Sequence, residues 1–163
     1  MAEPRHLTSL LDVLLEEQVS FILVGALAAV AQGAPVMTHD VDIVHERSPE
    51  NLDRLMVALG KLEARYRGRG AESPLPADRR ALAGTGHSLL MTKLGPLDCL
   101  GAIEEGRDYE ALVPLSVDVE FNDRRLRVLT LETIVALKRN STELKDRLNL
   151  PIFEAALKAT RGQ

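Results

Sequence analysis

The sequence predicts an α+β fold in which a mixed sheet is flanked by helices and further helices close the C-terminal end. Short apolar, strand-like segments alternate with helical periodicities in the first half of the chain, and hairpin-like strand pairs precede helices in the second half. The 163 residues are 45% hydrophobic and 27% charged, which is ordinary for a globular protein. We therefore expect one domain over residues 1–163, with its C-terminal helices over about residues 130–163.

The first third of the chain predicts two strands among three helices. Apolar spacing predicts helices over residues 6–18, 26–32 and 49–61 and strands over residues 21–24 and 41–44. The first strand is uniformly apolar and does not alternate with polar residues, which is typical of an interior strand. Gly25 ends that strand, and Ser48 followed by Pro49 supplies an N-cap and a first-turn proline to the third helix.

The remainder predicts a long loop, four strands and three helices. Residues 65–84 are rich in Gly, Pro, Arg and Ala without periodicity, so we expect a loop that either stays solvated or contacts substrate or RNA. Four strands are expected, over residues 87–91, 94–100, 117–121 and 126–129. One short helix is expected over residues 108–112. Asn122 and Asp123 predict a hairpin turn, and two final helices begin at Thr130 and are interrupted around Asn140.

The composition argues against several classes of protein. Aromatic residues make up 3% of the chain and Trp is absent, so there is little material for stacking single-stranded nucleobases. A net charge of −4 argues against a surface built as a whole for polyanions. Cys99 is the single cysteine, which rules out an internal disulfide, and its apolar neighbours indicate a buried structural thiol. No signal peptide or membrane-length apolar run is evident, so we expect a cytoplasmic protein outside the membrane.

Two carboxylates near a glycine turn carry the functional hypothesis. On a strand, Asp40 and Asp42 point to one face while Val41 and Ile43 point to the other. Their separation of about 7 Å along the strand suits a cradle for Mg²⁺, because this ion prefers carboxylate oxygens as protein ligands. Gly25 ends the preceding strand, so the sequence predicts a metal site that faces a glycine turn.

These motifs stand in an order that resembles a known superfamily. Gly25-Ala26, thirteen intervening residues and then Asp40-Val41-Asp42-Ile43 resemble the signature of the polymerase-β-type nucleotidyltransferases. Residues 95–100 resemble the strand with that superfamily's third carboxylate, here Asp98, and residues 127–132 with Lys138, Lys145 and Asp146 resemble its closing segment. The similarity covers about residues 5–160 and is strongest to small stand-alone bacterial nucleotidyltransferases related to abortive-infection toxins.

The resemblance implies a nucleotidyltransferase fold and a Mg²⁺-dependent enzyme that moves a nucleoside monophosphate from an NTP to an acceptor hydroxyl. Asp40, Asp42 and Asp98 would be its catalytic and metal-binding residues, and Asp98 would also help to deprotonate the acceptor. Backbone N–H groups at Gly25 and Ala26 would bind the phosphates, because glycine lets the backbone come close.

The resemblance also bears on partners and on departures from the pattern. Lys93 would add a cationic contact to the nucleotide, and the acceptor would lie on RNA, protein or a small molecule. A toxin component would in addition have an antitoxin partner. Three positions depart from the pattern: related proteins often have Gly or Ser in place of Ala26, Arg in place of Val36 and Arg in place of Glu143. These departures imply either a different substrate or a site that no longer turns over.

Several alternatives stay open at this point. Asp118 and Glu120 are rival third carboxylates, although their alternating hairpin predicts solvated side chains, and Asp98 is also compatible with a surface carboxylate. Lys138 and Lys145 are either helix-surface charges or contacts to the nucleotide. The whole chain is compatible with a catalytically inactive nucleotidyltransferase-fold binding module, or with an unrelated α+β interaction domain.

Overall fold

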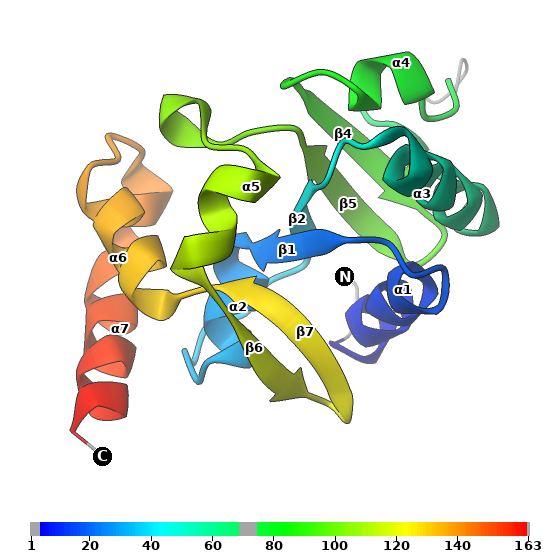
Figure 1. The fold of residues 1–163 in the computed structure, drawn as a ribbon. Helices are drawn as coiled ribbons and strands as arrows, with labels where there is room; N and C mark the ends of the chain where they lie inside the picture. The colour runs from blue at the N-terminus through cyan, green and yellow to red at the C-terminus, as the bar shows by residue number, and fades with distance from the viewer. Residues whose placement is uncertain (1–3, 69–74, 163) are drawn as a thin grey trace.

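The computed structural model describes residues 4–68 and 75–162 (Figure 1). Within them a seven-stranded mixed sheet has the order β3-β4-β5-β2-β1-β7-β6. The strands are β1 (Phe21–Val24), β2 (Val41–His45), β3 (Arg65–Tyr66), β4 (His87–Thr92), β5 (Gly95–Leu100), β6 (Ser116–Phe121) and β7 (Arg124–Leu129). The α-helices are α1 (Pro4–Glu16), α2 (Gly25–Ala31), α3 (Pro49–Lys61), α4 (Arg79–Leu82), α5 (Tyr109–Leu112), α6 (Leu131–Arg139) and α7 (Leu144–Arg161).

These elements confirm the predicted α+β class and most of the predicted segments. Helix α3 has the predicted bounds because Ser48 Oγ accepts the Asn51 N–H at 3.3 Å and Pro49 occupies the first turn. Asn122 and Asp123 have φ angles of 48° and 65°, as a tight two-residue hairpin turn between β6 and β7 requires. The local signals in the sequence therefore place these boundaries correctly.

The predicted loop over residues 65–84 is wrong in part. Strand β3 pairs antiparallel with β4, and α4 is a single turn whose N-cap, Asp78, accepts a backbone N–H at 3.0 Å. A two-residue strand and a four-residue helix are too short to have a recognisable periodicity, so their formation depends on tertiary pairing. Arg69 and Gly70, which belong to the same predicted loop, lie outside the described residues.

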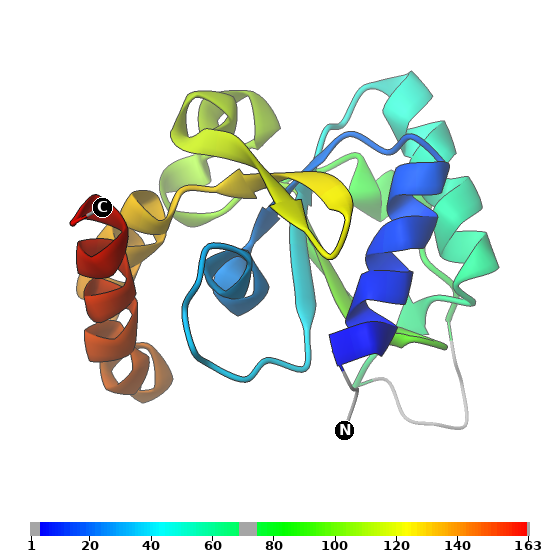
Figure 2. The same cartoon turned by 90° about the horizontal axis from the view of Figure 1, so that it is seen from below.

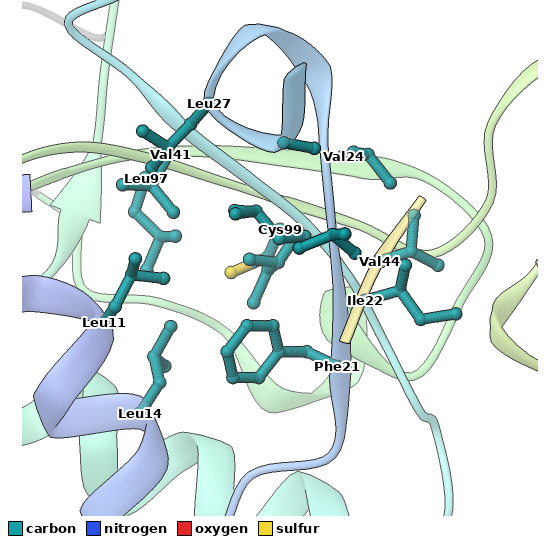
Figure 3. Packing of buried hydrophobic residues seen from close by; sticks show 14 of the residues in the cluster. Leu11, Leu14, Phe21, Ile22, Val24, Leu27, Val41, Val44, Leu97 and Cys99 are labelled. Carbon is teal, nitrogen blue, oxygen red and sulfur yellow. The ribbon is translucent and has the colours of Figure 1, made fainter. Parts of the chain in front are cut away.

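A hydrophobic core lies between the sheet and helices α1 and α3, which pack against each other (Figures 2 and 3). Leu11 and Leu14 of α1 point toward Phe21 of β1 and toward Leu97 and Cys99 of β5. The Cys99 side chain is fully buried, and this burial raises the pKa of its thiol. The predicted burial of the single cysteine is confirmed.

The order and direction of the central strands position the candidate site. Strand β2 pairs antiparallel with β1 and parallel with β5. In this register Val24 lies opposite Asp42, and Asp42 lies opposite Asp98. Cross-strand partners present their side chains on the same face of a sheet, so the two aspartates are neighbours.

Helices α6 and α7 follow the sheet and pack against each other beside α2, at the end of the molecule away from α1 and α3 (Figures 1 and 2). Gln32, directly after α2, joins these parts because its side chain donates to Leu129 O at 2.8 Å and accepts the Leu131 N–H at 2.9 Å. Among the described residues, no helix combines the length and apolarity needed to cross a bilayer.

Replacement of Asn51 by Ala is expected to destabilise the fold by about 2–3 kcal/mol. The fully buried Asn51 amide accepts the Ser20 N–H at 2.7 Å and donates to Ser20 O and Glu46 O. In the variant the Ser20 N–H and Glu46 O would lose this partner, whereas Ser20 O would keep the Glu46 N–H. Urea unfolding measures the change. Asp53→Ala on the same helix is the control, because its ion pair with Arg79 is exposed and is worth about 0.5 kcal/mol or less. An equal effect of both variants would contradict this assignment.

Candidate active site

The glycine turn between β1 and α2 is crowded by an aspartate. Gly25 has a φ angle of +71°, which side chains of L-residues rarely tolerate. A Cβ atom at Gly25 would lie 2.4 Å from Asp42 Oδ2, which is far inside van der Waals contact. The first turn of α2 receives no side-chain cap from Val24, its N-cap residue. Glycine is therefore required here for both its backbone conformation and its lack of a side chain.

Asp42 and Asp98 form a pair of largely buried carboxylates under this turn. They come from adjacent parallel strands in direct register, as described above. Asp42 Oδ1 and Asp98 Oδ1 are both buried and have no hydrogen-bond partner among the described residues. Buried polar atoms without partners are uncommon in folded proteins and are typical of sites that bind an ion, a water or a substrate.

The proximity of the two carboxylates changes the acidity of one of them. Burial, followed by the negative charge of Asp98 and a hydrogen bond to it, raises the pKa of Asp42 from 3.8 to about 7. The charge of Asp40 raises it further, whereas the charge of Lys145 lowers it. A carboxyl group that resists ionisation in this way gains free energy from any cation that enters beside it.

Arg67 provides a cation that the sequence did not lead us to expect at this position. Its Nη2 lies 2.7 Å from Asp98 Oδ1, as an ion pair without hydrogen-bond geometry, and its Nη1 donates to Leu90 O. The Arg67 N–H donates to Leu89 O at 2.9 Å, which extends the β3–β4 pairing by one residue. The arginine-rich segment was predicted to be solvated or to contact substrate, but at Arg67 it neutralises a carboxylate of the protein itself.

Asp40 lies beside this pair without joining it. Strand β2 begins at Val41, so the predicted strand face does not include Asp40, whose N–H donates to Thr38 Oγ1 in a local turn. Among the residues that the structure describes, no three His, Cys, Asp or Glu side chains are grouped to hold one metal ion. The carboxylate oxygens of Asp42 and Asp98 nevertheless fit Mg²⁺, because two of them are buried without hydrogen bonds to other described residues and oxygen is the ligand that this ion prefers.

The remaining predicted site residues lie at different distances from the pair. Ala26 follows Gly25 in the first turn of α2. Lys93 lies in the β4–β5 turn, where its ammonium group is 4.0 Å from Glu63 Oε2, and it does not line the cavity beside Asp42. The rival carboxylates Asp118 and Glu120 are exposed on β6, at the opposite edge of the sheet from β3, and so are not brought to Asp98.

A cavity of about 160 Å³ opens next to Gly25 and Asp42. It is bounded by the ends of β1, β5 and β7, by the segment after β5, and by α6 and α7. Its lining residues are Val24, Gly25, Asp42, Leu100, Ile103, Glu104, Leu129, Ile134, Leu137, Lys138 and Asp146. The walls are thus mainly apolar, with charged groups gathered near the carboxylate pair and at the C-terminal helices.

Lys138 and Asp146 form the charged wall of this cavity. Lys138 Nζ donates to Asp146 Oδ1 at 2.9 Å and lies 4.9 Å from the centroid of the Phe153 ring. Burial alone would raise the pKa of Asp146, but hydrogen bonds from Lys138 and Ser141 and the charges of Lys138 and Lys145 lower it overall. The interpretation of Lys138 as a helix-surface charge is wrong, since its side chain is 16% exposed and lines the cavity.

Comparison with known proteins gives structural matches. No protein-family model matches the chain, and no curated protein matches it in sequence. The lincosamide antibiotic adenylyltransferase LnuA, bound to lincomycin, matches with a TM-score of 0.66 and 13% identity, over 95% of this chain and 98% of LnuA. ANT(2″)-Ia in complex with adenylyl-2″-tobramycin matches with a TM-score of 0.59 and 15% identity, over 95% of this chain and 89% of that one. This chain has the nucleotidyltransferase fold.

A third match is a candidate nucleotidyltransferase from Thermotoga maritima, with a TM-score of 0.54 and 22% identity over 99% of this chain and 94% of that one. Each match spans nearly the whole of both chains, so the nucleotidyltransferase fold includes the C-terminal helices as well as the sheet. The predicted fold is confirmed, and the roles of Asp40, Asp42 and Asp98 stay predictions.

Two features of this site were missed in the sequence. Arg67 carries no local signal, because its approach to Asp98 depends on the register between β3 and β4. The sequence indicated the Lys138–Asp146 pair only weakly, because both residues stand in the segment that resembles the superfamily's closing motif. In addition, Phe153 follows Asp146 by seven residues and lies on the same side of α7, where it is buried. Spacing of about seven residues returns to the same side of a helix.

Asp42→Asn is expected to raise the melting temperature more at pH 8 than at pH 5, by about 5–8 °C or roughly 2–3 kcal/mol. The pKa of Asp42 is about 7 in the folded protein, whereas the ordinary pKa of an aspartate is 3.8. Between pH 3.8 and pH 7 the folded state therefore keeps a proton that the unfolded state has released. Stability from this group therefore falls as the pH rises from about 4 to about 7. Asparagine cannot ionise and avoids this loss.

Thermal unfolding of both proteins without added metal at pH 5 and pH 8 measures the difference. Asp118→Asn, an exposed carboxylate on β6, is the matched control and is expected to shift neither value. A destabilisation by Asp42→Asn that is the same at both pH values would contradict the raised pKa.

Proposed function

We propose that this chain is a divalent-cation-dependent nucleotidyltransferase, which moves a nucleoside monophosphate from an NTP to an acceptor hydroxyl. The observation that carries the proposal is the buried Asp42–Asp98 pair, held in register by β2 and β5 directly against the Gly25 turn. The shared fold with adenylyltransferases makes this chemistry the first to consider, but fold alone does not establish an activity.

Asp42 and Asp98 would hold the ion, with Asp40 as an additional carboxylate nearby. Mg²⁺ bound there would neutralise charge on the triphosphate during transfer. The buried Oδ1 atoms support this role, because among the described residues that of Asp42 has no hydrogen-bond partner and that of Asp98 has only the ion pair with Arg67. An ion between them would satisfy both and relieve the repulsion that raises the pKa of Asp42. Arg67 would then release the oxygen of Asp98 that it now contacts.

The chain's own residues would divide the remaining work. Asp98 would accept the proton of the acceptor hydroxyl, whose oxygen then bonds to the α-phosphorus as the bond from that phosphorus to the β-phosphate bridging oxygen breaks and pyrophosphate leaves. Backbone N–H groups at Gly25 and Ala26 would bind phosphate oxygens, and the apolar cavity beside Lys138 would exclude water. Lys93 would contact the nucleotide only if it left Glu63.

The matched structures suggest which acceptor to test first. LnuA binds lincomycin, and ANT(2″)-Ia is seen with adenylylated tobramycin, so both take small molecules. We therefore place ATP and a hydroxylated small molecule first among the substrates of this chain, ahead of RNA and protein acceptors. The proposal also includes binding to an antitoxin protein as a second role of this chain.

A catalytically inactive binding module is the second candidate. It is favoured by Arg67, which already neutralises Asp98, and by the absence, among the described residues, of a three-carboxylate group that would include Asp40. In this alternative the cavity beside Gly25 and Lys138 would bind a nucleotide without transferring it.

The two candidates are separated by label transfer from each of the four α-³²P-labelled NTPs with Mg²⁺, offered total RNA, total protein and a pool of hydroxylated small molecules. The wild type is expected to label one fraction, and Asp42→Ala or Asp98→Ala to lower the rate by about 1000-fold, or about 4 kcal/mol of transition-state stabilisation. Asp118→Ala is the control and is expected to keep full activity. Equal labelling by the wild type and both variants, or none by the wild type in any fraction, would refute the enzymatic proposal.

A further inference from the structure

The last helix, α7, carries an apolar stripe on the side opposite to its buried face. Its members are spaced by three or four residues and are Leu144, Leu148, Ile152, Ala155 and Ala159. At 100° per residue they fall within an arc of roughly 80° on one side of the helix. Leu144 is 71% exposed and Leu148 is 66% exposed, so the stripe is not part of the core.

The core-facing side of α7 is a different one. Phe153 is fully buried, and Leu150 and Leu157 lie on the same face of the helix and pack against the core. Figure 1 shows α7 as the outermost element on its side of the molecule. The fold therefore already uses one apolar side of α7 and leaves a second one uncovered.

A groove runs along the C-terminal half of this stripe, from Ile152 to Ala159. One wall is formed by Ile152, Ala155 and Ala159 of α7, and the other by Gly33 and Pro35 in the segment after α2. The groove has a volume of about 550 Å³ and has only apolar or glycine residues in these walls. Small side chains such as alanine and glycine allow a second backbone to come close, which suits a docked helix.

Within the described residues, one flank of the stripe carries two unpaired positive charges, because Glu154, the acidic residue on that flank, is already paired with Arg139. Arg147 and Lys158 lie on one flank, at helical positions within about 20° of each other. Neither forms an ion pair among the described residues. The two acidic residues within α7, Asp146 and Glu154, are already paired with Lys138 and Arg139 of α6. A basic edge on this surface is notable in a chain whose net charge is −4.

These charges argue against a second copy of α7 as the occupant. Antiparallel pairing of two α7 stripes would place Arg147 near Lys158 of the other copy, and parallel pairing would place this flank against the opposite flank, which carries Lys145. Both arrangements bring like charges together, which opposes association. A partner with carboxylates at the edge of its apolar face would instead meet complementary charge.

We propose that the α7 stripe and its groove bind an amphipathic helix of a partner protein, whose apolar face is bordered by Asp and Glu. The apolar side chains of that helix would pack along Leu148 and Ile152 and into the groove, while its carboxylates pair with Arg147 and Lys158. This surface is separate from the Asp42–Asp98 site, so the proposal does not depend on catalysis.

Two synthetic helical peptides test it against the full chain by fluorescence anisotropy. They share one apolar face of Leu and Ala at helical spacing and differ in whether Glu or Lys borders that face. The acidic peptide is expected to bind with a Kd of about 10 μM and at least about tenfold more tightly than the basic one. High salt is expected to reduce the difference. Leu148→Glu should weaken binding at least about tenfold, and the double variant Arg147→Glu, Lys158→Glu should reverse the preference.

Val57→Glu is the matched control, because Val57 is an apolar residue 51% exposed on α3, and it should bind like the wild type. Equal binding of both peptides, binding of neither, or acidic-peptide binding that Leu148→Glu leaves unchanged would overturn the proposal. A sedimentation experiment that finds a dimer of the wild type and a monomer of Leu148→Glu would overturn it in favour of a second copy.

Discussion

The parallel pairing of β2 with β5 is the constraint on which the site depends. Its register places Asp42 directly beside Asp98, and the antiparallel pairing of β2 with β1 places the same Asp42 against the Gly25 turn. Two adjacent, largely buried carboxylates repel each other and lose hydration, which destabilises the folded protein near neutral pH. A fold that keeps such a pair gains from a cation between them, and Arg67 meets part of this need from within the chain.

The C-terminal helices add a second charged group to the same region. Lys138 and Asp146, one from each helix, form the outer wall of the cavity that begins at Asp42. Because Gln32 joins the end of α2 to both β7 and α6, the glycine turn and this wall are held by one hydrogen-bonded connection. Changes at the helices would therefore be felt at the site, even though the apolar stripe of α7 faces the other way.

Much of this architecture could be predicted from sequence because it rests on local signals. Ser48 and Pro49 fixed the start of α3, and the positive-φ pair Asn122 and Asp123 fixed the β6–β7 hairpin. The Asp42–Asp98 pair was predicted only through the resemblance to nucleotidyltransferases, since its formation depends on strand order. Arg67 could not be predicted, because a two-residue strand has no periodicity and its register with β4 is a tertiary property.

The central claim is that Asp42 and Asp98 together form a divalent-cation site. A crystal structure of the chain with Mn²⁺ and a non-hydrolysable NTP analogue tests it most directly, because anomalous scattering locates the ion without reference to activity. The account predicts an anomalous peak within coordination distance of both carboxylates, about 2 Å from their oxygens, with the Arg67 guanidinium moved away from Asp98. An ion bound elsewhere, or no ion while Arg67 keeps its contact with Asp98, would contradict it.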